Sequence, residues 1–190
     1  MTTTPGPQEP IAGVKTKIDH AAPSFDNCAK AGIYMLRYFF VPGQPQGKAR
    51  AKIVMRGKYA HAYTPEKTVC YESLIVTSYL EKYGRECPAD CELRIIIRAV
   101  FPVPKSTSKK QAGLMLAGEV APTKKPDADN IAKVICDALN GIAYADDTRI
   151  VTMMLTKEYG AVPGVWVLLD DEWKTLNADA MIEAIDTIPF

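Results

Sequence analysis

The sequence lacks the features that mark membrane, secreted and disulfide-rich proteins. No apolar run among its 190 residues is long enough to cross a bilayer, and its first residues show no signal-peptide pattern. Its five cysteines are an odd number, which favours reduced thiols. Cys87 and Cys91 have no second Cys/His pair at the spacing of a zinc site. We therefore expect a cytoplasmic protein without disulfides or structural zinc.

Net charge is almost absent as well, at +1 near neutral pH, which by itself argues against a nucleic-acid partner. The charges are unevenly distributed, however, because the tail from Asp170 is acidic and two other stretches are basic. The first stretch holds Lys48, Arg50, Lys52, Arg56 and Lys58, and the second holds Lys105, Lys109, Lys110, Lys124 and Lys125. Two interpretations remain open. The stretches are solvated loops, which is the commoner case, or they form a phosphate-binding surface that the acidic tail hides in the total.

The length suits one domain. Residues 1–32 mix Pro, Gly and Thr without a sustained period and predict a flexible N-terminal extension, so the single domain spans residues 33–190. The β-branched and aromatic residues predict a strand at 33–41, a strand at 92–101 that is buried on both faces, and a hairpin formed by 149–157 and 165–169.

Three helices are expected. The first has Thr64 as its N-cap and Pro65 at its first position and ends before Gly84; the second lies between the aspartates described below; the third covers residues 177–185. Residues 104–123 predict a long functional or mobile loop. The order of elements predicts an α+β fold, in which helices pack on a mixed β-sheet.

Residues 124–147 gather carboxylates at both ends of one short helix. The helix is predicted by apolar residues at the spacing of one buried face, and it ends at Asn140 and Gly141. The apolar face comprises Ile131, Val134, Ile135, Ala138 and Leu139. Asp129 is a candidate N-cap, and Asp129, Lys133 and Asp137 share the polar face because they are four residues apart. The carboxylates at the ends are Asp127 and Asp129 on one side and Asp146 and Asp147 on the other.

These aspartates allow two interpretations. They could be helix caps and a solvated turn, but several neighbouring carboxylates repel one another and need a cation, a proton or strong donors. A hard divalent cation is therefore a candidate ligand. A calcium loop of the EF-hand type is excluded, since Ile131 stands where an oxygen ligand is required and Ala132 where the turn needs glycine. Asp146 and Asp147 are expected at the start of a strand, where only one of two neighbours can face a given site.

The segment resembles the RusA family of Holliday junction resolvases, often encoded by prophages. The resemblance rests on P-D-A-D-N at residues 126–130, on Lys133, on D-A-L at 137–139 and on the D-D pair at 146–147. VPGQPQGKARAK and AYTPEKTVCYE also resemble the family's N-terminal half. The resemblance implies that Asp127, Asp129 and Asp147 are metal ligands, that these three and Lys133 are the catalytic residues, and that Asp146 and Asp137 have supporting roles.

A RusA-like fold further implies a crossover junction endodeoxyribonuclease that makes paired symmetric nicks in four-way DNA junctions. The implied cofactor is Mg²⁺, with Mn²⁺ as a substitute, and the implied assembly is a homodimer. Lys48, Arg50, Lys52, Arg56 and Lys58 would then contact DNA phosphates. A non-catalytic protein that binds branched or single-stranded DNA is the alternative. A nucleotide-sugar transferase with a D-x-D motif is disfavoured, because the sequence has no glycine-rich phosphate loop.

Overall fold

A computed structural model of the chain describes residues 35–56, 59–85 and 88–171. The predicted extension at residues 1–32, the first residues of the predicted strand at 33–41, the predicted helix at 177–185 and Lys58 lie outside the described residues. In the described part, no helix combines the length and the apolar composition needed to span a membrane.

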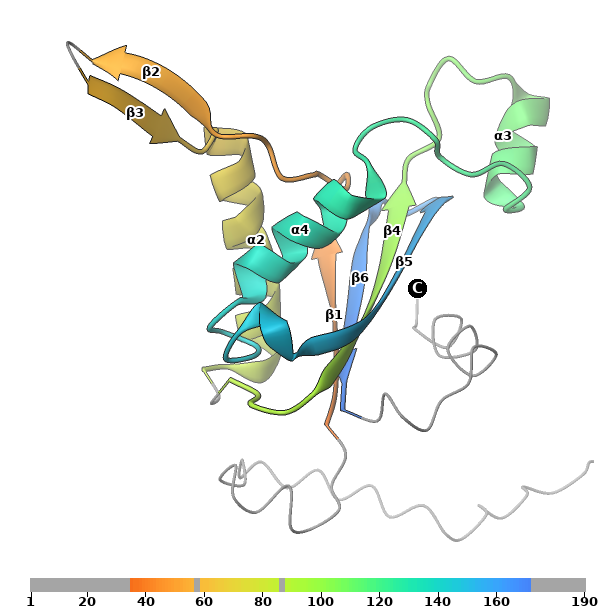
Figure 1. Ribbon diagram of the computed structural model, residues 1–190. Helices are drawn as coiled ribbons and strands as arrows, with labels where there is room; N and C mark the ends of the chain where they lie inside the picture. The colour runs from red at the N-terminus through yellow and green to blue at the C-terminus, as the bar shows by residue number, and fades with distance from the viewer. Residues whose placement is uncertain (1–34, 57–58, 86–87, 172–190) are drawn as a thin grey trace, which may run out of the picture.

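Four strands form one mixed sheet with the order β1-β6-β4-β5. The strands are β1 (Leu36–Pro42), β4 (Leu93–Phe101), β5 (Ile150–Tyr159) and β6 (Gly164–Asp170). β6 pairs antiparallel with β1 and with β4, whereas β4 pairs parallel with β5. The α+β fold with a mixed sheet, predicted from the sequence, is confirmed (Figure 1).

β4 is the central strand of the domain, and all nine of its residues are buried. Its alternate residues Ile95, Ile97 and Ala99 belong to the main core, while Ile96 packs with Leu168 in a second, smaller cluster. The opposite sides of one strand thus meet different sets of apolar side chains, as the pleat requires. The prediction that the isoleucine-rich strand is buried on both faces is confirmed.

The expected hairpin between the last two strands is wrong, although both strands exist. β5 and β6 do not pair with each other, because β4 lies between them and bonds to both. The turn that joins them crosses the end of β4, where the Gly160 N–H donates to the carbonyl of Phe101 over 3.0 Å. Proximity in sequence favoured the hairpin, but β4, whose nine residues are all buried, is better accommodated with a hydrogen-bonded neighbour on each edge.

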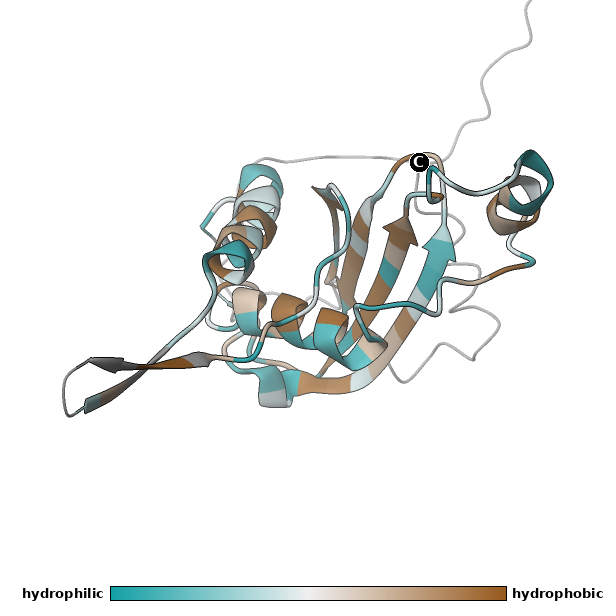
Figure 2. Cartoon of the chain, turned by 90° about the horizontal axis from the view of Figure 1, so that it is seen from above, coloured by the Kyte–Doolittle hydropathy of each residue, from teal (hydrophilic) through white to brown (hydrophobic). Residues whose placement is uncertain are grey.

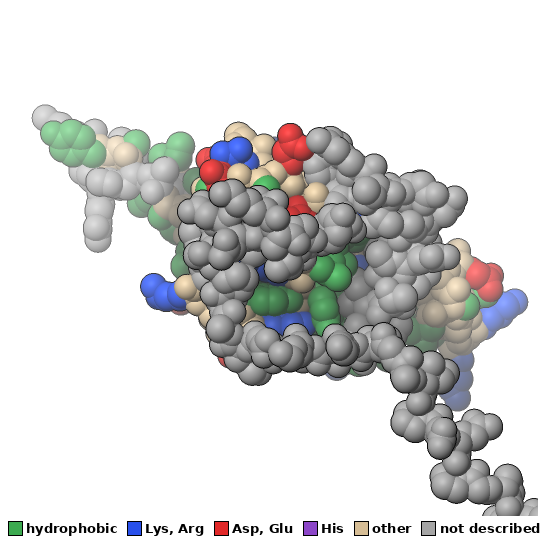
Figure 3. All heavy atoms as spheres, turned by 90° about the horizontal axis from the view of Figure 1, so that it is seen from below, with side chains coloured by type: hydrophobic (Ala, Val, Ile, Leu, Met, Phe, Trp, Pro, Cys, Tyr) green, Lys and Arg blue, Asp and Glu red, His purple; other side chains and the backbone are tan. Residues whose placement is uncertain are grey.

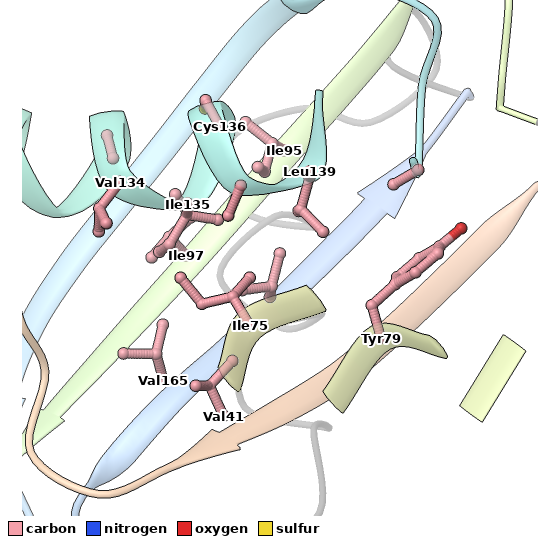
Figure 4. Close-up of a cluster of buried hydrophobic side chains, with 14 of the residues drawn as sticks. Val41, Ile75, Tyr79, Ile95, Ile97, Val134, Ile135, Cys136, Leu139 and Val165 are labelled. Atoms are coloured by element: carbon pink, nitrogen blue, oxygen red, sulfur yellow. The ribbon is translucent and has the colours of Figure 1, made fainter. Parts of the chain in front are cut away.

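Two helices, α2 (Glu66–Tyr83) and α4 (Ala128–Leu139), pack against each other on one face of the sheet (Figure 2). Figure 4 shows the core between them and the sheet, with Ile135 and Leu139 of α4 beside Ile95 and Ile97 of β4. α2 ends at Gly84, as predicted, and this glycine adopts a positive φ of 67°. Its N-cap is Pro65 rather than the expected Thr64, so the helix begins one residue later.

Two further elements stand away from this core. β2 (Lys52–Arg56) and β3 (Tyr59–Tyr63) form an antiparallel ribbon that projects beyond α2, and hydrophobic side chains are visible on it in the space-filling view (Figures 1 and 3). α3 (Lys109–Leu116) lies beyond the end of β4, and its N-cap Ser108 accepts a bond from the Gln111 N–H. The loop predicted at 104–123 therefore contains a two-turn helix, which the Ser-x-x-Gln pattern could have indicated.

Candidate active site

α4 has the two faces that the sequence predicts. All five residues of the predicted apolar stripe, from Ile131 to Leu139, are buried, and the helix ends at Asn140 and Gly141 as expected. Its start differs from the prediction. Asp127 is the N-cap residue, with its carbonyl accepting from the Ile131 N–H at 3.1 Å, and Asp129 lies within the first turn. An acidic residue in that turn is favoured by the helix dipole.

The polar face of α4 borders a hollow of about 470 Å³. Asp129, Lys133 and Asp137 line it from the helix, and Asp147 lines it from the segment that leads into β5. Five apolar or sulfur-bearing residues complete the wall, namely Ala132, Cys136, Ile150, Val151 and Met153. Three carboxylates and one lysine, drawn from two parts of the chain, thus share one opening to solvent.

The adjacent residues Asp146 and Asp147 have different surroundings. Asp147 begins a single 3-10 turn, η1 (Asp147–Arg149), and lines the hollow, whereas Asp146 is the N-cap of this turn. The Asp146 carboxylate accepts from the Thr148 N–H over 2.9 Å, and hydrogen bonds from Thr148 hold its pKa below the ordinary value. The expectation that the pair lies at the start of a strand is wrong, because Asp146 caps and Asp147 begins the 3-10 turn that precedes β5. The turn, and not the alternation of a strand, gives the two side chains different surroundings.

Asp127 is not among the residues that line the hollow, and its side chain makes no capping hydrogen bond. Within the described residues, no three Asp, Glu, His or Cys side chains converge into a ready-made metal site. The carboxylates that line the hollow are nevertheless the ligand type that hard divalent cations take. A cation such as Mg²⁺ is often held by only one or two carboxylates and keeps several of its waters, so it does not require three carboxylates to converge.

Lys133 is held only loosely. Its side chain is 63% exposed, and its Nζ lies 3.7 Å from the Asp137 Oδ1, one helical turn away. An exposed pair of this kind contributes little free energy, so the ammonium group can move to another anion.

Lys48 does not occupy a free basic loop. Its Nζ donates to the Glu72 carboxylate on α2 and lies 3.0 Å from the Asp137 Oδ2 on α4. Burial alone would lower the pKa of Lys48, but the hydrogen bonds to the two carboxylates outweigh that effect and raise it. Glu72 was not expected from the sequence, because it lies 24 residues from Lys48 and carries no motif of its own.

The remaining basic residues of the predicted DNA-binding set differ in position. Arg50 is exposed in the segment before the ribbon, and Lys52 and Arg56 are the first and last residues of β2. The predicted basic loop is thus a linker followed by a β-ribbon. The ribbon also exposes apolar side chains, among them Ile53 at 72% and Tyr59 at 75%.

Lys157 is a second residue near the site that sequence reasoning missed. From β5 its Nζ donates to the carbonyls of Lys124 and Pro126, at 2.9 Å each, and so anchors the segment that leads into α4. Its ammonium group also lies 5.3 Å from the centre of the Phe101 ring. No local sequence pattern predicts these contacts, because they join residues more than thirty positions apart.

Cys136 forms part of the wall of the hollow. Burial raises the pKa of its thiol to about 11, and the Tyr144 hydroxyl donates to its carbonyl oxygen over 3.0 Å. At neutral pH the wall therefore presents a protonated, neutral sulfur beside the carboxylates.

An α+β domain that brings aspartates and an exposed lysine to one open hollow has the groups of an enzyme acting on phosphate esters. Residues 42–170 match the model of the family described as Endodeoxyribonuclease RusA, and the chain belongs to this family. Membership indicates the activity of a Holliday junction resolvase, an endodeoxyribonuclease that acts on branched DNA. The chain is also similar to the uncharacterised protein YqaN of Bacillus subtilis strain 168, with 29% identity over 133 residues, which are 69% of this chain and 93% of YqaN.

Proposed function

We propose that the protein resolves Holliday junctions by metal-dependent hydrolysis of phosphodiester bonds, with paired symmetric nicks. The observation that carries the proposal is the hollow, where Asp129, Lys133 and Asp147 meet in a chain of the RusA family. These are three of the four residues whose catalytic roles the family resemblance implies. Asp127, the fourth, precedes the same helix by one residue.

Asp127, Asp129 and Asp147 would hold Mg²⁺, for which Mn²⁺ is a substitute. All three are exposed carboxylates, which is the ligand type that either ion accepts. When bound, the ion supplies Lewis-acid chemistry at the oxygens of the scissile phosphate. The chain's own contribution is to keep these carboxylates open to solvent, with Asp146 engaged by Thr148 instead of competing at the hollow.

Lys133 would stabilise the negative charge that develops on the phosphate. Its loose contact with Asp137 leaves the ammonium group available, and its position one turn after Asp129 keeps it beside the same hollow. Removing a preorganised charge of this kind typically slows a reaction by about 10²- to 10³-fold.

DNA would lie across the polar face of α4. The linker and the ribbon supply basic residues on one side of this helix, and α3 supplies Lys109 and Lys110 on the other (Figure 1). On the face seen in Figure 3, acidic and basic side chains of the described residues lie near one another. That view shows no large patch of positive or negative charge among the coloured side chains. Phosphate contacts from such residues give affinity that depends on salt and carries little sequence information.

A homodimer follows from the substrate. A four-way junction has two-fold symmetry, and two symmetric nicks need two active sites. A C2 dimer with one active site in each subunit supplies these two sites in the required symmetric arrangement.

The test is cleavage of a synthetic four-way junction. With Mg²⁺, the wild-type protein should make paired nicks, and Asp129→Asn should lower the rate by about 100-fold or more while junction binding is retained. Glu119→Gln is the matched control, because it neutralises an exposed carboxylate that does not line the hollow. Absence of cleavage by folded wild-type protein with both Mg²⁺ and Mn²⁺ would refute the proposal.

The second candidate is a non-catalytic protein that binds branched or single-stranded DNA. It is favoured by the absence, among the described side chains, of three converged metal-binding groups. It predicts that Asp129→Asn leaves every activity of the protein intact, which is the opposite of the first proposal.

A further inference from the structure

Lys48 has the contacts of a structural residue, although its place in the sequence suggests a phosphate contact. Its Nζ lies between two carboxylates, that of Glu72 on α2 and that of Asp137 on α4. The three side chains are only 23%, 23% and 29% exposed. Contact with a DNA phosphate would bring a third anion to one ammonium group and would place the phosphate beside two carboxylates, which repel it.

The backbone around Lys48 is fixed to the start of α4. The Lys48 N–H donates to the carbonyl of Asn130 over 2.9 Å. A Cβ on the preceding Gly47 would lie 2.9 Å from the Cβ of Pro126 and 3.0 Å from that of Asn130, so only glycine fits without a shift. The linker therefore packs directly on the turn that carries Asp129, and Lys48 extends from there along the helix to Asp137.

Asp137 is shared by two lysines that differ in distance and exposure. Lys48 is the nearer, at 3.0 Å and largely sheltered, whereas Lys133 is at 3.7 Å and 63% exposed. Without Lys48, the full charge of Asp137 would attract Lys133, and it would also repel a phosphate entering the hollow. With Lys48 in place, the charge of Asp137 is offset in part by an ammonium group that it shares with Glu72.

We infer that Lys48 is a positioning residue of the catalytic centre, which neutralises Asp137 and so leaves Lys133 free for the scissile phosphate. The same contacts tie α4 to α2 through Glu72. This inference rests on the proposed function, because it assigns Lys48 a part in the step that Lys133 assists. It also removes Lys48 from the set of residues expected to contact DNA.

The experiment compares Lys48→Met with the double variant Lys48→Met/Asp137→Asn. Methionine keeps most of the side-chain volume and removes the charge. We expect Lys48→Met to lower kcat on a four-way junction by about 10- to 100-fold, the usual effect of losing a supporting residue, with KM changed by less than about threefold. Neutralising Asp137 in the double variant should restore at least about tenfold of that loss, because the charge that captured Lys133 is gone.

Metal-free junction binding gives a second readout, which does not depend on cleavage. A residue that contacts a phosphate contributes about one unit to the slope of log K against log salt concentration. Lys48→Met should leave this slope unchanged, whereas Arg50→Met, the matched control from the exposed part of the same linker, should reduce it by about one.

The outcomes separate the two proposals. If wild-type protein does not cut, the resolvase proposal fails, and the binding slope still decides whether Lys48 contacts phosphate. The positioning role is overturned if Lys48→Met reduces the salt slope of junction binding and leaves kcat unchanged. It is also overturned if the double variant cleaves the junction no faster than Lys48→Met. If Lys48→Met does not fold, Lys48→Gln replaces it in both measurements, because it also removes the charge, and the same outcomes decide.

Discussion

Cys136 is the residue whose chemistry depends most directly on its place in the wall of the hollow. Burial raises the pKa of its thiol from 9.0 to about 11, so we expect iodoacetamide to modify it at pH 8 about 100-fold more slowly than an ordinary thiol, because only the thiolate reacts. Cys70, which is exposed on α2, is the internal comparison. Mass spectrometry of the two peptides measures both rates.

The same raised pKa makes a contribution to stability that depends on pH. The unfolded chain gives up this proton near pH 9 and the folded chain near pH 11, so the contribution is complete below pH 9 and is lost as the pH rises to 11. The reactivity of Cys136 should increase over the same window. Equal labelling of Cys136 and Cys70 at pH 8 in folded protein would contradict the prediction, and equal labelling in urea is the expected control.

The residues of the site differ in how far sequence could predict them. Asp129, Lys133 and Asp147 stand in a motif with fixed spacing, and they do meet at one hollow. Glu72 and Lys157 could not be predicted, because each contacts the site through a bond between distant positions that no local pattern encodes. Lys48 was assigned to DNA for its charge and for the resemblance of its loop to the family's basic loop, and neither shows the carboxylates folded against it.

The contact between the linker and α4 can be tested at the scale of elements. Gly47→Ala places a methyl group against Pro126 and Asn130, and overpacking of this kind costs about 1–3 kcal/mol. We therefore expect a lower free energy of unfolding and slower cleavage, because the helix that carries Asp129 and Lys133 must shift. Urea titration measures the first effect, and junction cleavage measures the second.

Gly113→Ala is the matched control for this change. Gly113 lies within α3, and a Cβ there has no neighbour within 4 Å. Alanine should stabilise the protein by about 0.5–1 kcal/mol, since glycine is unfavourable inside a helix. If the two substitutions lower stability equally, the close approach of the linker to α4 does not exist in solution.

Elements with a strong local period were predictable, whereas their partners were not. The stripe from Ile131 to Leu139 fixed the position of α4 because a helix buries every third or fourth residue. The ribbon of β2 and β3 was interpreted as a loop, since its short strands have no core to produce an alternating pattern. β5 and β6 were located correctly and paired wrongly, because pairing depends on where β4 fits and not on the two strands themselves.

At the scale of the whole molecule, the net charge of +1 concealed where the charges lie. One basic stretch precedes α2 and the other lies between α2 and α4 in sequence. In the fold, the ribbon and α3, which carry residues of the two stretches, stand on opposite sides of α4 (Figure 1). A total charge near zero therefore does not argue against DNA as a substrate, because a phosphate chain responds to the local field within about 10 Å and not to the sum.

The proposed dimer makes a prediction that concerns two copies of the chain. If each subunit of a C2 dimer cuts one strand, a dimer of one wild-type and one Asp129→Asn subunit should nick a junction once and not resolve it. Co-expression with two different affinity tags isolates this mixed dimer, and wild-type dimers carrying both tags are the control. On a supercoiled plasmid with an extruded cruciform, paired nicks give linear DNA and a single nick gives the open circle. We expect the mixed dimer to yield almost only open circles, whereas linear product at the rate of the control would show that one active subunit cuts both strands and that the protein does not act as a symmetric pair.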